Sequence, residues 1–155
     1  MAAASPCKKL FTNAAIVTYD HDPDATTAQV TTPDAGTTKR YVAMANYGGF
    51  AGIVMATIAT TGPTLVDIVA ATDSAGTDVT TVISSGTVAA DAVGDVVVVE
   101  CSAEQIKEQG VTSGKDFTHV GVRITCGNSG DECAVTYIRH SPRFPKDALT
   151  ANAIS

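Results

Sequence analysis

The residues that could carry chemistry are few and far apart along the chain. The three histidines, His21, His119 and His140, stand in no pattern typical of catalysis, and such histidines are far more often surface residues than catalysts. The sequence also has no G-x-S-x-G elbow, no H-E-x-x-H motif and no phosphate-binding glycine loop. We therefore expect a protein that is not an enzyme, with no catalytic residue and no cofactor.

The densest acidic stretch is Asp20-His-Asp-Pro-Asp24, where carboxylates alternate as they do at the start of a calcium-binding loop. Such a loop also needs a central glycine and a bidentate glutamate, and Thr31 stands where the glutamate would be. Aspartate and proline favour solvated turns without any metal. We expect a turn at residues 20–24 and no metal site.

The four cysteines form no C-x-x-C pair and have no histidine at zinc-finger spacing, which leaves a structural zinc site without support. Cys126 and Cys133 flank the polar loop Gly127-Asn-Ser-Gly-Asp-Glu132 and could face each other across a hairpin. Free thiols are the default for a protein made in the cytoplasm. The alternative is a disulfide between Cys126 and Cys133, formed after release into an oxidising medium.

The composition indicates that strands position these residues. The chain of 155 residues contains 22 Thr, 18 Val and 9 Ile against 3 Leu, and β-branched side chains favour strands. The net charge of −6 argues against a general nucleic-acid binder. No apolar run approaches the roughly 20 residues of a membrane span, and the first residues lack the order of a secretory signal. We expect one mostly β domain made in the cytoplasm.

Short β-prone segments recur between turn residues. The segments at 53–58 and 96–99 have no polar face, which predicts strands buried on both sides. The segment at 117–125 alternates, with Val120, Val122 and Ile124 on one face. The other predicted strands cover residues 14–19, 26–32, 40–46, 65–70, 79–83 and 133–139.

One helix is predicted at residues 103–109. Ser102 and Gln105 form a capping box, and Gly110 supplies a stop. Eight or nine short strands with one short helix predict an all-β fold, either a β-sandwich or a jelly-roll-like barrel. The expected organisation is an N-terminal arm at 1–10, a body at 11–140 and a C-terminal arm at 141–155, where Pro142 and Pro145 disfavour a central strand.

The basic residues gather toward the two ends of the chain, whereas residues 67–100 contain six acidic residues and no Lys or Arg. Each end also carries a lone phenylalanine. One interpretation is that charged ends simply remain in water. The other is that both arms bind an acidic or apolar partner. For this second interpretation the candidate contact residues are Lys8, Lys9, Phe11, Arg143, Phe144 and Lys146.

Four segments together resemble small head proteins of tailed bacteriophages, which act as capsid decoration or cement proteins. The segments are Ile68-Val-Ala-Ala-Thr-Asp-Ser-Ala-Gly-Thr-Asp78, Val82-Ile-Ser-Ser-Gly-Thr87, Asp95-Val-Val-Val-Val-Glu100-Cys-Ser-Ala-Glu-Gln-Ile106 and His119-Val-Gly-Val-Arg-Ile-Thr125. The resemblance covers roughly residues 12–145 and carries over no functional residue. It implies a β-sandwich body, self-association as a trimer or dimer, and arms that contact the major capsid protein.

The resulting expectation is a structural virion protein that binds the outer surface of an icosahedral phage capsid and stabilises it. We expect synthesis in the host cytoplasm, location on the virion, and no nucleic-acid or membrane partner. The alternative is a carbohydrate- or surface-binding β module, such as a head fibre or adhesin domain. Sugar stacking needs exposed aromatic side chains, and the chain has no Trp, 4 Tyr and 4 Phe. A small hydrolase is the last hypothesis, because no motif supports it.

Overall fold

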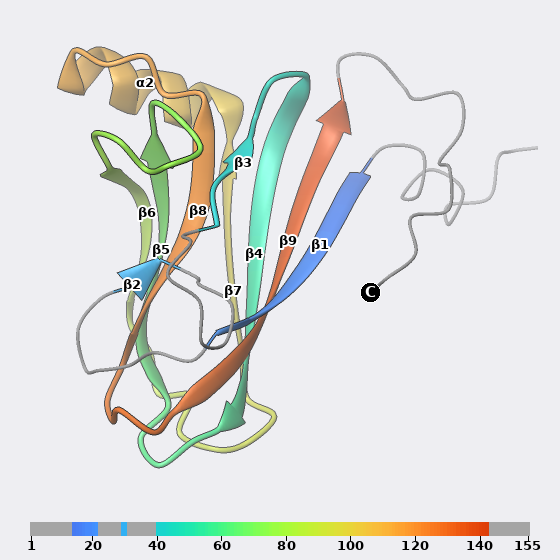
Figure 1. The fold of residues 1–155 in the computed structure, drawn as a ribbon, viewed down its shortest axis with the longest axis vertical. Helices are drawn as coiled ribbons and strands as arrows, with labels where there is room; N and C mark the ends of the chain where they lie inside the picture. The colour runs from blue at the N-terminus through green and yellow to red at the C-terminus, as the bar shows by residue number, and fades with distance from the viewer. Residues whose placement is uncertain (1–13, 22–28, 31–39, 143–155) are drawn as a thin grey trace, which may run out of the picture.

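The computed structural model describes residues 14–21, 29–30 and 40–142, and there the chain forms two antiparallel sheets and one helix (Figure 1). Sheet A has the strand order β1 (Ala14–His21), β9 (Glu132–Pro142), β4 (Tyr47–Ile58) and β7 (Val96–Ser102). Sheet B has the order β2 (Gln29–Val30), β8 (His119–Cys126), β5 (Pro63–Ala71) and β6 (Thr80–Thr87), and β3 (Val42–Ala43) also pairs with β8. The predicted β-sandwich is confirmed.

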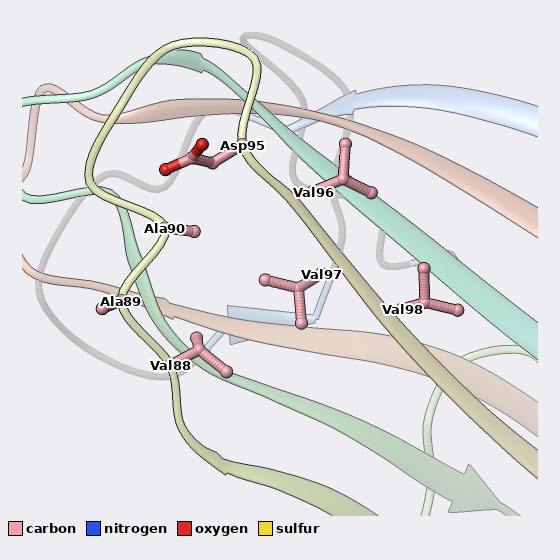
Figure 2. Close-up of a pocket in the computed structure, with 7 residues that line it drawn as sticks. All are labelled: Val88, Ala89, Ala90, Asp95, Val96, Val97 and Val98. Atoms are coloured by element: carbon pink, nitrogen blue, oxygen red, sulfur yellow. The ribbon is translucent and has the colours of Figure 1, made fainter.

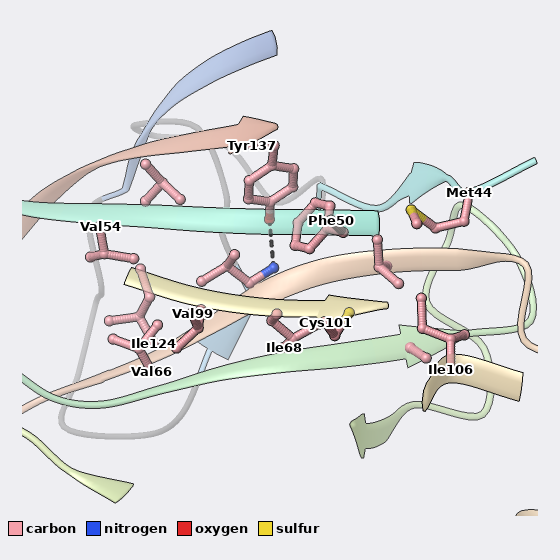
Figure 3. Packing of buried hydrophobic residues seen from close by; sticks show 14 of the residues in the cluster. Met44, Phe50, Val54, Val66, Ile68, Val99, Cys101, Ile106, Ile124 and Tyr137 are labelled. Carbon is pink, nitrogen blue, oxygen red and sulfur yellow. Dashed lines mark hydrogen bonds between the residues drawn. The ribbon is translucent and has the colours of Figure 1, made fainter. Parts of the chain in front are cut away.

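The core lies between the two sheets, where buried apolar side chains from both sheets pack against one another (Figure 3). The predicted inward face of β8 is confirmed, because Val120, Val122 and Ile124 are fully buried. On sheet A, the rings of Phe50 and Tyr137 pack edge to face with centroids 5.1 Å apart, an arrangement that aromatic pairs prefer. The core is therefore built from side chains of both sheets, as in other β-sandwiches.

Two strands that the sequence predicts to be buried on both sides are buried on one side only. On β4, Val54 is fully buried, whereas Met55 is 41% exposed. On β7, Val96 and Val98 are 53% and 59% exposed. The prediction was wrong because a short apolar run does not reveal whether a second layer covers the strand.

Strand β5, by contrast, is buried on both faces. Val66 and Ile68 face the core between the sheets, and Val69 lies on the outer face of sheet B in a second cluster. That cluster includes Tyr41, whose ring packs so closely on Gly76 that a Cβ there would lie 2.4 Å from it. The turn between β5 and β6 therefore folds back over sheet B, and the hairpin predicted there is confirmed.

The helix α2 (Ala103–Ser113) covers one end of the sandwich and contacts β4, β6 and β7 (Figure 1). The capping box is confirmed: the N–H of Ser102 donates to Gln105 Oε1 at 2.8 Å, and the N–H of Gln105 donates to Ser102 Oγ at 3.2 Å. The stop predicted at Gly110 was wrong, since the helix ends at Gly114 with φ 66°. Gly110 instead makes room for the returning chain, because a Cβ there would lie 2.6 Å from the carbonyl oxygen of Lys115.

Two strands of sheet A run past the ends predicted for them at residues 19 and 139. Strand β1 continues to His21, and its Asp20 and His21 pair with Ala134 and Cys133 rather than forming a turn. The remainder of that acidic stretch lies outside the described residues. Strand β9 runs to Pro142, which pairs with Tyr47, two residues past the predicted end of the body.

Candidate interaction surface

The outward side of sheet A carries an apolar surface in the part of the chain that the structure describes. The register places Ile16 beside Ile138, Ile53 beside Val98, and Met55 beside Val96. Of these six residues, Ile16, Met55, Val96 and Val98 are the most exposed. We call this set the outer apolar face: Ile16, Ile53, Met55, Val96, Val98 and Ile138. Contiguous exposed apolar side chains of this kind mark interaction sites in soluble proteins.

Strand β7 is an edge of sheet A among the described strands. The N–H of Ala56, at the end of β4 next to this edge, donates to the carbonyl of Asp95 at 3.0 Å. Along an antiparallel pair of strands, hydrogen-bonded residue pairs then recur at every second position. Ladder bonds to β4 therefore fall at Val97, Val99 and Cys101. The backbone groups of Val96 and Val98 point away from β4, where an added strand could pair with them.

A groove of about 460 Å³ runs beside this edge, lined by residues 88–90 and 95–98 (Figure 2). Val97 points toward Val88, whereas Val96 and Val98 point to the other side of the strand. The wall opposite β7 is fixed by the backbone, since the N–H of Val88 donates to the carbonyl of Thr64 at 2.9 Å. The β7 edge thus combines an apolar face, backbone groups directed away from β4, and a shallow groove.

The charge around this edge is negative. Residues 41–106 contain no Lys, Arg or His but have seven acidic residues, Asp67, Asp73, Asp78, Asp91, Asp95, Glu100 and Glu104. Asp91 and Asp95 precede β7, Glu100 lies on it, and Glu104 follows it on α2. A partner strand that carries basic residues would therefore complement the edge electrostatically.

Sheet B carries the clearest ion pair, on its own outer face. Asp67 on β5 stands opposite Arg123 on β8, whose Nε donates to Asp67 Oδ2 at 3.2 Å and whose Nη2 also reaches it. The Nη2 atom donates to Thr81 Oγ1 at 2.7 Å as well. The pair joins three strands of sheet B, because Thr81 lies on β6. Asp67 is almost fully buried, and the Arg123 guanidinium compensates its charge through Oδ2, whereas Oδ1 has no hydrogen-bond partner among the described residues.

His119 and His140 each hydrogen-bond to the hydroxyl of an adjacent residue. Within residues 14–21, 29–30 and 40–142, no three His, Cys, Asp or Glu side chains are grouped so that they could hold a metal. His119 Nδ1 hydrogen-bonds to Thr118 Oγ1 at 2.8 Å, and His140 Nδ1 to Ser141 Oγ at 3.1 Å. In the same part of the chain, no helix has both the length and the apolarity to cross a membrane.

The predicted site residues fall into two groups. Cys126 and Cys133 lie together as free thiols between the sheets. The six arm residues, Lys8, Lys9, Phe11, Arg143, Phe144 and Lys146, lie outside the described residues. Ala14 pairs with His140 and Pro142 pairs with Tyr47, so these two ends of the described strands lie at the same end of sheet A.

The outer apolar face was not predicted, because Ile53, Met55, Val96 and Val98 lie in two runs expected to be buried on both sides. A run such as Val96–Val99 looks the same whether one or both sides are covered. One signal was present: residues 41–106 lack basic residues altogether, and an exposed strand in such a region would normally carry Lys as protection against edge pairing.

Comparisons with known proteins give structural similarity only. No protein-family model matches the chain, and no curated protein matches it. A chain of the infectious bursal disease virus VP2 subviral particle is similar over 82% of this protein, with 13% identity and a TM-score of 0.41. A chain of the Triatoma virus empty capsid is similar over 98%, with 10% identity and a TM-score of 0.45. This protein spans 33% of the first chain's length and 79% of the second's.

Proposed function

We propose that this protein is a structural virion protein, a decoration protein that binds the outer surface of an icosahedral phage capsid and stabilises it. The observation that carries the proposal is the outer apolar face beside the β7 edge, with Met55, Val96 and Val98 exposed. The outward positions of a β-sandwich normally hold polar residues, so an exposed apolar face fits a protein that works in contact with neighbours. The sequence resemblance to small phage head proteins supports the same function.

The occupant we assign to the β7 edge is the N-terminal segment of a second copy. Residues 1–13 contain two lysines and no acidic residue, together with Leu10 and Phe11. The charge thus complements the acidic residues around β7. Thirteen residues reach up to about 45 Å when extended, which is ample for a neighbouring subunit. Each copy would then present its arm at the β1 side and receive an arm at the β7 side.

Photo-cross-linking tests this occupant directly. Benzoylphenylalanine replaces Val98 in full-length protein, and equal amounts of unlabelled and nitrogen-15-labelled chains are bound to capsids before illumination. We expect cross-links from position 98 to residues 1–13 of the other isotopic chain. Links confined to a single chain, links to the major capsid protein, or no links at position 98 would each overturn the assignment.

Truncation tests the proposed function itself. Chains that lack residues 1–10 or 141–155 keep every strand of sheets A and B except the last two residues of β9. We expect both truncated proteins to stay folded by circular dichroism and to lose sedimentation with purified capsids. Capsid occupancy equal to that of the full chain in both truncations would show that capsid binding needs neither arm, and would refute the proposed role of the arms.

The alternative, a carbohydrate-binding module, receives little support from the described aromatic side chains. Tyr41, Phe50, Phe117 and Tyr137 are buried, and Tyr47 is half-buried under the guanidinium of Arg139, 4.7 Å from its ring centre. A sugar site would need such rings to be open for stacking. Binding on a glycan array would favour this alternative over the virion function.

A further inference from the structure

The two cysteines that flank the β8–β9 loop come from opposite sheets. Cys126 is the last residue of β8 in sheet B, and Cys133 is the second residue of β9 in sheet A. Each residue is only 1% exposed, and the two thiols lie close enough in the same buried cluster for each to shift the pKa of the other. One thiol from each sheet therefore meets the other where the chain crosses the sandwich.

The loop between them is held in place by Asp131. Its Oδ1 accepts a hydrogen bond from the N–H of Thr60 at 2.6 Å, and its Oδ2 accepts from Thr61 Oγ1 at 3.2 Å and from the N–H of Asn128 at 3.0 Å. Gly127 fits tightly against the same segment, because a Cβ there would lie 2.3 Å from Thr61 Oγ1. These contacts fasten both ends of the loop, and they keep the two thiols together.

The two thiols differ in acidity. The hydrogen bond from Cys133 lowers the pKa of Cys126, and the same bond together with burial raises the pKa of Cys133. Cys126 is therefore the first of the pair to become a thiolate, the form that attacks an oxidant. Cys101, on β7, gives an internal comparison, because burial raises its pKa to about 12.

We propose that Cys126 and Cys133 form an intramolecular disulfide that fastens sheet A to sheet B when the protein meets a peroxide. The Cys126 thiolate attacks one oxygen of hydrogen peroxide, which breaks the O–O bond, releases hydroxide and leaves a sulfenic acid. The Cys133 sulfur then attacks the Cys126 sulfur, and the departing hydroxide takes the Cys133 proton as water. Two thiols and one peroxide thus yield one disulfide and two waters.

This disulfide has a predictable consequence for stability. It closes a loop of eight residues, 126–133, and so restricts the unfolded chain more than the folded one. Both thiols already lie in the same buried cluster at the two ends of this loop, so we expect the bond to form with little rearrangement of the strands. We expect the melting temperature of the oxidised protein to rise by roughly 5 °C or more. The inference is independent of the proposed virion function.

Peptide mapping of the full-length protein tests the proposal. Trypsin cleaves after Arg123 and Arg139, so both cysteines fall in the peptide 124–139, while Cys7 and Cys101 fall in others. After exposure to hydrogen peroxide and then iodoacetamide, we expect this peptide to be two hydrogen atoms lighter than the dithiol form and unalkylated. Cys101 should still be alkylated once the protein is denatured.

Matched variants show whether the bond does what we propose. Cys101→Ser should retain the rise in melting temperature, and a reductant should reverse it. Cys126→Ser and Cys133→Ser should show no rise. A peptide that stays alkylatable at both positions, or that stops at a sulfinic acid, would overturn the proposal. So would a disulfide that leaves the melting temperature unchanged.

Discussion

The hydroxyl of Tyr137 on sheet A accepts a hydrogen bond of 2.8 Å from the backbone N–H of Val122 on sheet B (Figure 3). The same hydroxyl donates to the carbonyl of Arg40 at 3.1 Å. A buried tyrosine needs such partners, because an unpaired hydroxyl in the core would be costly. This group therefore joins the two layers by polar contacts through an otherwise apolar interior.

Replacing Tyr137 by Phe should weaken this connection. The ring packing on Phe50 is retained, but the Val122 N–H loses its inter-sheet acceptor, at a cost of about 1 to 3 kcal/mol. Urea unfolding measures the change, with Tyr47→Phe as the matched control on the adjacent strand. An unfolding free energy equal to that of the original protein would show that the hydroxyl does not connect the sheets energetically.

The Asp67–Arg123 pair predicts an asymmetry between single and double variants. Arg123→Met leaves a buried carboxylate without its cation, which should cost about 3 kcal/mol or more. Adding Asp67→Asn removes the unpaired buried charge and should restore part of the lost unfolding free energy. Equilibrium unfolding of the three proteins measures it, and a double variant less stable than Arg123→Met would contradict the assignment.

Asp131 makes the β8–β9 loop sensitive to acid. Burial alone would raise its pKa, but hydrogen bonds from Thr60, Thr61 and Asn128 outweigh burial and lower it. A carboxyl group whose pKa is lower in the folded protein than in the unfolded chain stabilises the fold at pH values above the unfolded pKa of about 3.9. This stabilisation is lost as the pH falls through the folded-state pKa.

The variant Asp131→Asn should therefore be less stable than the original protein at pH 7, by about 2 to 4 kcal/mol. This difference in unfolding free energy should become smaller as the pH falls below the pKa of aspartate in the unfolded chain, because Asp131 of the original protein is then protonated. Urea unfolding at neutral and acidic pH measures both differences. A gap that stays constant with pH would mean that the charge of Asp131 does not matter.

The outer apolar face should tolerate a charge without unfolding. Val98→Lys places an ammonium on an exposed position, so stability should change by less than about 0.5 kcal/mol. If this face binds a neighbour, the same variant should lose capsid occupancy. Val111→Lys, on the exposed side of α2, adds the same charge elsewhere and should bind normally. Full capsid occupancy by Val98→Lys would show that the outer apolar face is not part of the binding surface.

Structural features were predicted correctly from the sequence where a residue pattern is compatible with a single local structure. Val120, Val122 and Ile124 alternate with polar residues, and this alternation identified the buried face of β8 correctly. Ser102 and Gln105 marked the start of the helix because both halves of a capping box are local. These features depend on neighbours along the chain, which the sequence displays directly.

Features that depend on distant segments could not be predicted in the same way. Val98 looked like a core residue because the sequence does not show which face of sheet A is left uncovered. Gly110 looked like a helix stop, yet its role is close packing against Lys115. Asp131 lay in a loop with no visible partner, and its contacts with Thr60 and Thr61 arise only from the folded chain.

The number of copies in a purified virus particle tests the central claim most directly. Under the proposed function a phage encodes this protein, and quantitative mass spectrometry of that phage's particles would compare its copy number with that of the major capsid protein. The proposed function predicts a fixed, simple ratio to the major capsid protein, retained after the particle's nucleic acid is released. Absence from the particles, or a trace amount that varies between preparations, would contradict it.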